Sequence, residues 1–442
     1  MTKAKSGSCS SSSSRENNNS NSGMGLLLVL FPQDKSTIAD RPKLNFPSPS
    51  KSLISKAQST ISICALLLFT TLLLFTLSTL PNTPHHPPKP PSHNYKGHHF
   101  ALHRMGTLYR RGTTSMTSLL ICHVADETPL DDFRSFIRLL HRSYLTSSTD
   151  VVFLFASPFS NSKFAPIIRQ ENHAFSSLLH LLSHFNSTRP KSSFDPNRFL
   201  FKGTQMGEPV WGTKIRSNLN SRESLSYGSV LSFDAPELDP ENSLAGFLDR
   251  VPLSLRRWAC YPMLLGRVRR NFKHVMLVDV KSVLILKDPL GRVRNRSPDS
   301  VFLFAKAEKH GRKSQTQSTQ RAVLSAIVMG GARGVRRLSS AVMVEIVRAA
   351  TQHRKKNSVS ESAVLSQLVG NEFILKNKNI NLIASTESIP EASSLAAHNS
   401  GASTSLSAFA IIQRGVSNHD LNYVIKKQIC SSVVDSSVYR DC

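Results

Sequence analysis

Continuous apolar runs alternate with segments of helical periodicity in the first half of the chain. Ser118–Val124 and residues 151–155 are apolar at nearly every position, which is typical of strands buried on both faces of a sheet. Residues 129–145 lie between them and place apolar side chains three and four positions apart, at Phe133, Phe136, Ile137, Leu139 and Leu140. This order predicts a β-α-β unit in a parallel sheet, followed by a second helix over residues 164–185.

The second half of the chain repeats the alternation. The first expected elements are a basic amphipathic helix over residues 252–271 and two short strands within residues 274–286. Two longer strands follow at residues 301–305 and 322–329. A glycine-rich turn at residues 330–334 then leads to helices over residues 337–352 and 360–369. Residues 190–245 are rich in Pro, Gly, Asn and Ser and predict long loops or an excursion from the sheet. The expected fold class is α/β, an open mixed or parallel sheet with helices on both faces.

One earlier segment is apolar on all sides and long enough to cross a bilayer. Residues 59–80 lie within a stretch that has no Asp, Glu, Lys or Arg from residue 57 to residue 88, and a helix of about twenty residues spans roughly 30 Å. A long polar segment precedes it, unlike the short start of a cleaved signal peptide. We therefore expect an uncleaved signal anchor; the alternative is a buried core helix.

Composition divides the chain into four parts. Residues 1–56 are mostly polar and predict a disordered tail, and residues 57–80 are the expected transmembrane anchor. Residues 81–113 are rich in Pro and His and predict an extended stalk, and residues 114–442 form the head domain. More Lys and Arg precede the anchor than follow it, which favours a cytosolic tail and a lumenal head. The expected location is the Golgi or another endomembrane.

The positive charge lies mainly in the expected lumenal part. The chain has 442 residues and a net charge of +26, of which residues 1–56 carry +5. A lumenal head does not meet DNA or RNA, so nucleic acid is not an expected partner. Anionic glycans, nucleotide-sugar phosphates or acidic lipid headgroups suit this charge, and a basic surface without a specific partner is the alternative. One basic cluster is expected on the surface: Arg256, Arg257, Arg267, Arg269 and Arg270.

An oxidising lumen bears on the cysteines and on one glycosylation sequence. Cys430 and Cys442 close a short loop and are the favoured disulfide, while Cys122 is equally well a buried free thiol. Asn186 begins an Asn-Ser-Thr sequence and is the expected glycosylation site. The cysteine spacing is not typical of a zinc site.

The sequence VMLVDVKSVLILKDPL, residues 275–290, follows the predicted basic helix. Over residues 250–380 the chain resembles nucleotide-sugar-dependent glycosyltransferases of the GT-A fold, especially the family-8-like group, whose D-x-D turn binds a divalent metal. The resemblance implies a nucleotide-sugar donor and a catalytic role for Asp279; a strand-end residue that caps the following turn is the alternative for Asp279. Lys281 stands in place of the second acid, and its charge repels a divalent cation. Two interpretations stay open: Lys281 neutralises the diphosphate itself, or the site is inactive.

Two further candidate groups follow. Glu361 stands where the resembling enzymes place an acid near the reacting sugar, so it is the second expected catalytic residue; an acid favoured by a helix start is the alternative. Gly330, Gly331 and Arg333 are expected to hold phosphate, because glycines let backbone N–H groups approach an anion and arginine offers forked donors. A glycine turn before a basic helix is the alternative there.

The order of tail, anchor, stalk and basic head, ending in YRDC, also resembles a family of plant type II membrane proteins. That resemblance implies no particular reaction. Two functions are therefore expected as alternatives. One is sugar transfer from a nucleotide-sugar donor to a glycan acceptor without a full metal site. The other is a non-catalytic lumenal scaffold that binds polyanions or other Golgi proteins.

Overall fold

The computed structural model describes most of the predicted head and a short part of the predicted anchor. The described residues are 62–74, 100–184, 194–200, 207–213, 225–239, 241, 251, 253–305, 322–352, 359–392, 408–415 and 419–442. The chain divides into two units, Met1–Ser92 and His93–Cys442. In the first unit residues 62–74 are helical, whereas the predicted tail and the rest of the predicted anchor lie outside the described residues. Within the described ranges, no helix combines the length and apolarity that a bilayer-spanning helix needs.

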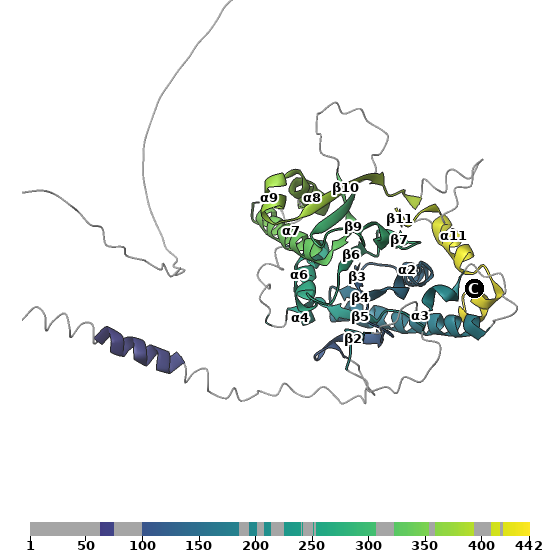
Figure 1. The fold of residues 1–442 in the computed structure, drawn as a ribbon, viewed down its shortest axis with the longest axis horizontal. Helices are drawn as coiled ribbons and strands as arrows, with labels where there is room; N and C mark the ends of the chain where they lie inside the picture. The colour runs from purple at the N-terminus through teal and green to yellow at the C-terminus, as the bar shows by residue number, and fades with distance from the viewer. Residues whose placement is uncertain are drawn as a thin grey trace, which may run out of the picture. The chain divides into compact units, whose positions relative to one another are not determined.

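A nine-stranded mixed sheet runs through the second unit, in the order β1-β2-β5-β4-β3-β6-β9-β8-β10 (Figure 1). Its centre is parallel and consists of β5 (Val230–Asp234), β4 (Thr149–Phe155), β3 (Ser118–Val124) and β6 (His274–Asp279). Antiparallel and parallel pairings then add β9 (Val323–Gly331), β8 (Ser300–Ala305) and β10 (Asn381–Ser388) on one side. On the other side β2 (Met105–Arg110) is antiparallel to β5 and to β1 (Phe100–Leu102). The predicted α/β class with a mixed sheet is confirmed.

Helices cover both faces of this sheet (Figure 1). The helices α2 (Leu130–Arg142) and α3 (Pro158–His184) pack on one face, and α6 (Arg257–Arg267), α7 (Ala332–Gln352) and α8 (Glu361–Gly370) pack on the other. Side chains of β3 alternate between the two cores: Leu120 and Cys122 lie with α2, and Leu119 and Ile121 lie with α6 and α7. Burial on both faces explains why β3 and β4 are continuously apolar in the sequence.

The remaining elements are short. They are η1 (Leu145–Ser147), η2 (Pro196–Phe199), α4 (Ala235–Leu238), η3 (Leu253–Leu255), β7 (Val283–Ile285), η4 (Leu290–Arg292), α9 (Glu372–Asn377), β11 (Ile411–Gln413), α11 (His419–Ile429) and α12 (Val433–Val438). The strands β7 and β11 pair with each other as a separate two-stranded sheet.

Three boundary predictions need correction. The predicted loops of residues 190–245 include β5, which is a strand of the central sheet; five buried residues among Pro and Ser are too short to show in composition. The sheet begins at Phe100 and not at residue 114, because β2 pairs with β5. The predicted turn at residues 330–334 does not form, since β9 continues through Gly331 and α7 begins at Ala332.

Ion pairs tie the C-terminal segment to the helices α2 and α3, and a disulfide closes a loop within the segment. Cys430 and Cys442 form that disulfide. The guanidinium of Arg138 donates two hydrogen bonds to buried Glu171, at 2.8 and 2.9 Å, and two to Asp441, each at 2.8 Å. Because a forked guanidinium satisfies two carboxylates at once, this contact fixes the chain end against both helices.

The glycines at the end of β9 allow close backbone packing. A Cβ atom on Gly331 would lie 2.2 Å from the carbonyl oxygen of Pro298, and one on Gly330 would lie 2.3 Å from the carbonyl oxygen of Ser300. Neither oxygen belongs to a movable side chain, so any larger residue forces the backbones apart. These glycines therefore allow the end of β9 to pack closely against the start of β8.

We predict that Gly331→Ala lowers the free energy of unfolding by about 1–3 kcal/mol or more, because the added methyl group overlaps a carbonyl oxygen. Gly266→Ala is the matched control: a Cβ there has no atom within 4 Å, and alanine in a helix is favoured by up to about 1 kcal/mol. Urea denaturation of the two variants measures the contrast. Equal stability of both variants would contradict this account of Gly331.

Candidate functional site

The order of the parallel strands marks one edge of the sheet as the place for a ligand. From β3 the chain proceeds to β4 and then β5 on one side, and it returns to the other side of β3 as β6. In open α/β sheets ligands bind at the carboxyl ends of the strands beside such a reversal. His123 of β3 and Asp279 of β6 are register partners at these carboxyl ends. The candidate site is built around this pair.

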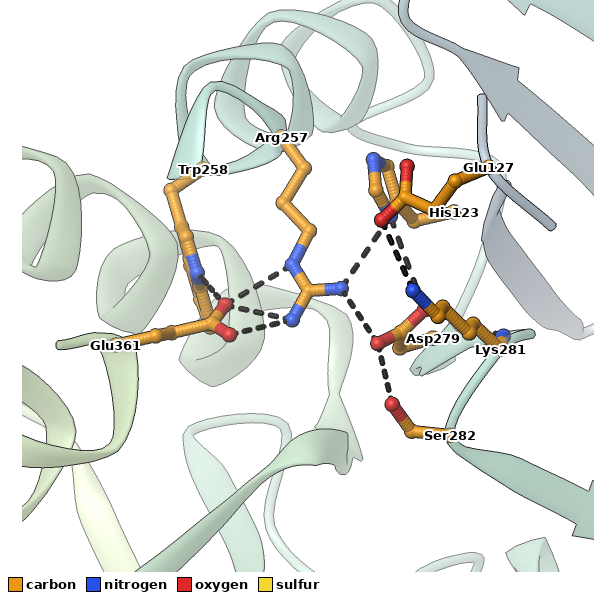
Figure 2. A network of polar contacts seen from close by, with 8 residues as sticks. All are labelled: His123, Glu127, Arg257, Trp258, Asp279, Lys281, Ser282 and Glu361. Atoms are coloured by element: carbon orange, nitrogen blue, oxygen red, sulfur yellow. Dashed lines mark hydrogen bonds and ion pairs between the residues drawn. The ribbon is translucent and has the colours of Figure 1, made fainter. Parts of the chain in front are cut away.

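A buried guanidinium lies at the centre of the site (Figure 2). Arg257 begins α6, and its Nε and Nη2 atoms donate to the carboxylate of Glu361 at 2.6 to 2.9 Å. Its Nη1 atom lies 3.5 Å from Asp279 Oδ2. Trp258 Nε1 also donates to Glu361 Oε1. One cation therefore bridges two acids that are 82 positions apart in the printed sequence.

Local structure explains why these acids stand where they do. Glu361 is the first residue of α8, where the positive end of the helix dipole favours a carboxylate. Asp279 is the last residue of β6, and it accepts hydrogen bonds from Ser282 Oγ at 2.6 Å and from the backbone N–H of Lys281 at 3.3 Å. The tight turn after β6 thus holds the Asp279 carboxylate in place.

His123 completes the cluster as a neutral group. Its Nδ1 atom lies 3.3 Å from Arg257 Nη1 and 4.0 Å from Asp279 Oδ1, between the cation and the acid. Burial, and in addition the charge of Arg257, lowers the pKa of His123. Its neutral ring therefore adds no positive charge to the site at neutral pH.

Asp279 and Arg257 shift each other's pKa. Burial alone would raise the pKa of Asp279, but the nearby His123, Arg257 and Ser282 outweigh it and hold that pKa well below its usual range. Burial alone would lower the pKa of Arg257, but Glu361 and Asp279 outweigh it and raise that pKa. Both groups therefore stay charged at neutral pH.

Lys281 lies at the exposed rim of the same site. Its ammonium donates to Glu127 Oε1 at 3.1 Å, and the side chains of Lys281 and Glu127 are 49% and 63% exposed. An ion pair this exposed contributes about 0–1 kcal/mol. An incoming anion can therefore replace Glu127 as the partner of Lys281 at little cost.

The site does not fit a divalent metal ion. Metal binding needs carboxylate oxygens that are free to coordinate, whereas Arg257 occupies the space between Asp279 and Glu361 and bonds to them. The ammonium of Lys281 opposes a second positive charge nearby. Throughout the described ranges, no group of three or more His, Cys, Asp or Glu side chains is placed to hold a metal ion.

The structure brings some of the predicted site residues together and separates others. Asp279, Glu361 and Lys281 share the carboxyl edge of the sheet. Gly330 and Gly331 pair with the first residues of β6, at its opposite end, and Arg333 makes an ion pair with Asp299 at 3.4 Å. The residues predicted to bind phosphate therefore lie at two opposite edges of the sheet. Lys281 is at one edge, and Gly330, Gly331 and Arg333 are at the other. The predicted glycosylation site, Asn186, lies outside the described residues.

The central residue of the site is not evident from the sequence. Arg257 belongs to the basic cluster predicted for the surface, but it is 6% exposed. Its neighbour Trp258 is the available signal, since a large aromatic residue beside a charge indicates a buried turn of the helix. Nothing in the sequence indicates that His123 and Ser282 belong to the site, because their roles depend on contacts between distant segments.

Comparison with known proteins identifies a family but no activity. A family model described as "Domain of unknown function (DUF7780)" matches residues 99–388. That range contains the whole nine-stranded sheet and every residue of the site described above. No curated protein matches the chain.

We predict that Arg257→Met lowers the free energy of unfolding by about 3–5 kcal/mol at pH 7, because it leaves two partly buried carboxylates without their cation. Arg256→Met is the matched control, since Arg256 bonds only weakly to the Val251 carbonyl oxygen, at 3.3 Å. Adding Glu361→Gln to Arg257→Met should recover part of the loss. Chemical denaturation of the single and double variants measures this, and an unchanged stability of Arg257→Met would refute the bridging role.

Proposed function

The chain belongs to the DUF7780 family, and we propose that it binds a nucleotide-sugar at the carboxyl edge of β3 and β6 and transfers the sugar without a metal ion. The observation that carries this proposal is the buried Arg257 bridge between Asp279 and Glu361. It fixes two carboxylates at a strand edge suited to ligand binding, beside the half-exposed ammonium of Lys281.

The contacts at the rim support a diphosphate as the anionic part of the ligand. Lys281 is half exposed and is paired only weakly with Glu127. It can turn toward a diphosphate while Arg257 holds both acids in position. A fixed cation next to a departing diphosphate stabilises the charge that develops as the bond to the sugar breaks. Lys281 is therefore the proposed phosphate-binding residue of this edge.

Asp279 and Glu361 are the proposed carboxylates of the reaction. Their side chains keep 17% and 15% exposure, so a ligand at the sheet edge can reach both carboxylates. In this proposal the bond between the sugar and the diphosphate breaks, a bond from the sugar to the acceptor hydroxyl oxygen forms, one of these carboxylates accepts the hydroxyl proton, and the nucleoside diphosphate leaves paired with Lys281. The donor sugar and the acceptor glycan are the substrates.

A second candidate function rests on a different surface. Arg269, Arg333, Arg336 and Arg337 crowd together where α6 ends and α7 begins. Burial, and then the charges of the other three arginines, lowers the pKa of Arg336. Such mutual repulsion is relieved by an anionic partner. A non-catalytic head that binds polyanions or other proteins of the same compartment is thus the alternative.

We further propose that the chain is a single-pass type II protein of the Golgi or another endomembrane. The support is the apolar stretch of residues 59–80 and the Lys and Arg that precede it. This orientation would place the sheet and its site in the lumen, where nucleotide-sugar donors and glycan acceptors meet.

We predict that the full-length chain, purified in detergent, binds UDP and UDP-sugars in isothermal titration, and that the affinity persists in EDTA. Lys281→Glu should weaken this binding tenfold or more, because it replaces a charge-assisted contact with a repulsive one. Lys378→Glu makes the same charge change on an exposed lysine after α9 and should leave binding unchanged. If no nucleoside diphosphate in a panel binds, or if binding requires Mn²⁺, the proposed function fails.

Membrane orientation has its own test. We predict that the chain made in eukaryotic cells carries a glycan that endoglycosidase removes, seen as a shift in gel mobility. Asn186→Gln should abolish the shift, and Asn295→Gln should keep it because Pro298 follows that sequence closely. An unmodified chain, together with digestion of the head by protease in intact vesicles, would overturn the lumenal assignment.

A further inference from the structure

A hollow lies far from the candidate site, at the opposite edge of the sheet. Its volume is about 1030 Å³, which is at the upper end of the range for small-molecule sites. Segments from five places in the chain form its wall: the end of α2, η1, η2, the stretch after β7, and α11. No motif in the sequence brings these segments together.

The strand directions separate this hollow from the candidate site. Ser148 lines the hollow and directly precedes β4, and the first residues of β3 and β4 pair with each other. Asp279 ends β6, which is parallel to β3, so it lies at the carboxyl ends of these strands. A strand of seven residues is about 20 Å long, so the two sites lie at opposite ends of the central strands.

Positive charge dominates the lining of the hollow. Four cationic side chains and one acid face it: Arg142, Arg198, Lys287, Arg294 and Asp288. Arg294 pairs with Asp288 at 2.7 Å and donates to Ser148 Oγ at 2.9 Å. Arg142 pairs with the buried Asp435. The acids nearby therefore compensate only part of this charge.

Two of these cations have no acid to balance them within the described part of the chain. Arg198 lies over the ring of Tyr144, 4.5 Å from its centre, and it makes no ion pair with a described residue. Lys287 likewise makes no side-chain ion pair there. Both are exposed on the wall of the hollow. Uncompensated cations that converge on one concave surface attract an anion.

We propose that this hollow binds a phosphorylated polyhydroxyl ligand, with its phosphate between Arg198, Lys287 and Arg294. The forked donors of arginine match phosphate oxygens. The volume is much larger than one phosphate needs, and the Ser147 hydroxyl and the Gln428 amide on the wall suit the hydroxyl groups of a sugar. The site is independent of the proposed nucleotide-sugar site.

Titration calorimetry on the full-length chain tests this proposal, with glucose 6-phosphate, glucose and inorganic phosphate as probes. Glucose 6-phosphate should bind more tightly than inorganic phosphate, and glucose should not bind. The double variant Arg198→Glu plus Lys287→Glu should weaken glucose 6-phosphate binding at least tenfold, because two charge-assisted contacts become repulsive. Lys378→Glu controls for the change in net charge, and thermal unfolding checks that each variant is folded.

Lys281→Glu distinguishes failure at the two sites. It should leave glucose 6-phosphate binding unchanged, while the double variant should leave UDP binding unchanged. The proposal is overturned if glucose 6-phosphate does not bind, if a folded double variant binds it as well as the unaltered chain does, or if Lys281→Glu alone removes the binding. Loss of UDP binding alone, in any variant, bears only on the proposed function.

Discussion

The arrangement of the sheet edge depends on the ion pairs of a single guanidinium. Arg257 begins a helix, where the helix dipole disfavours a positive charge, and it is nearly excluded from water. Only Glu361 and Asp279 make that position tolerable. The same pairs link the starts of α6 and α8 to the end of β6. Removing a buried cation from such a cluster costs several times more than removing an exposed one.

This constraint also decides what the edge can do. An aspartate at the end of a central strand is a natural metal ligand when its oxygens are free. Here Asp279 is held by Arg257, Ser282 and the turn that leads to Lys281. The cation that Asp279 binds is therefore the Arg257 side chain and not a metal ion. A chemistry that needs positive charge at this edge can draw on Arg257 and Lys281.

The two ends of the central strands carry opposite chemistry. At the carboxyl ends two acids surround one buried cation, and the exposed charges are nearly balanced by the pair of Lys281 with Glu127. At the amino ends cations predominate, in the hollow beside Ser148 and around Arg336. The large net charge of the chain is thus distributed unevenly. A parallel arrangement makes this possible, because it places all the starts at one edge and all the ends at the other.

The sequence alone determined the fold class, the helices that flank the sheet and the position of Asp279 at a strand end. Periodicity and continuous apolar runs report burial, which is a local property of each segment. The sequence did not reveal β5 among loops, the close packing that Gly331 allows, or the burial of Arg257. Tertiary structure decided those, because each depends on a segment far along the chain: β2 and β4 beside β5, Pro298 beside Gly331, and Glu361 beside Arg257. A charge looks exposed in a sequence until its distant partner is known.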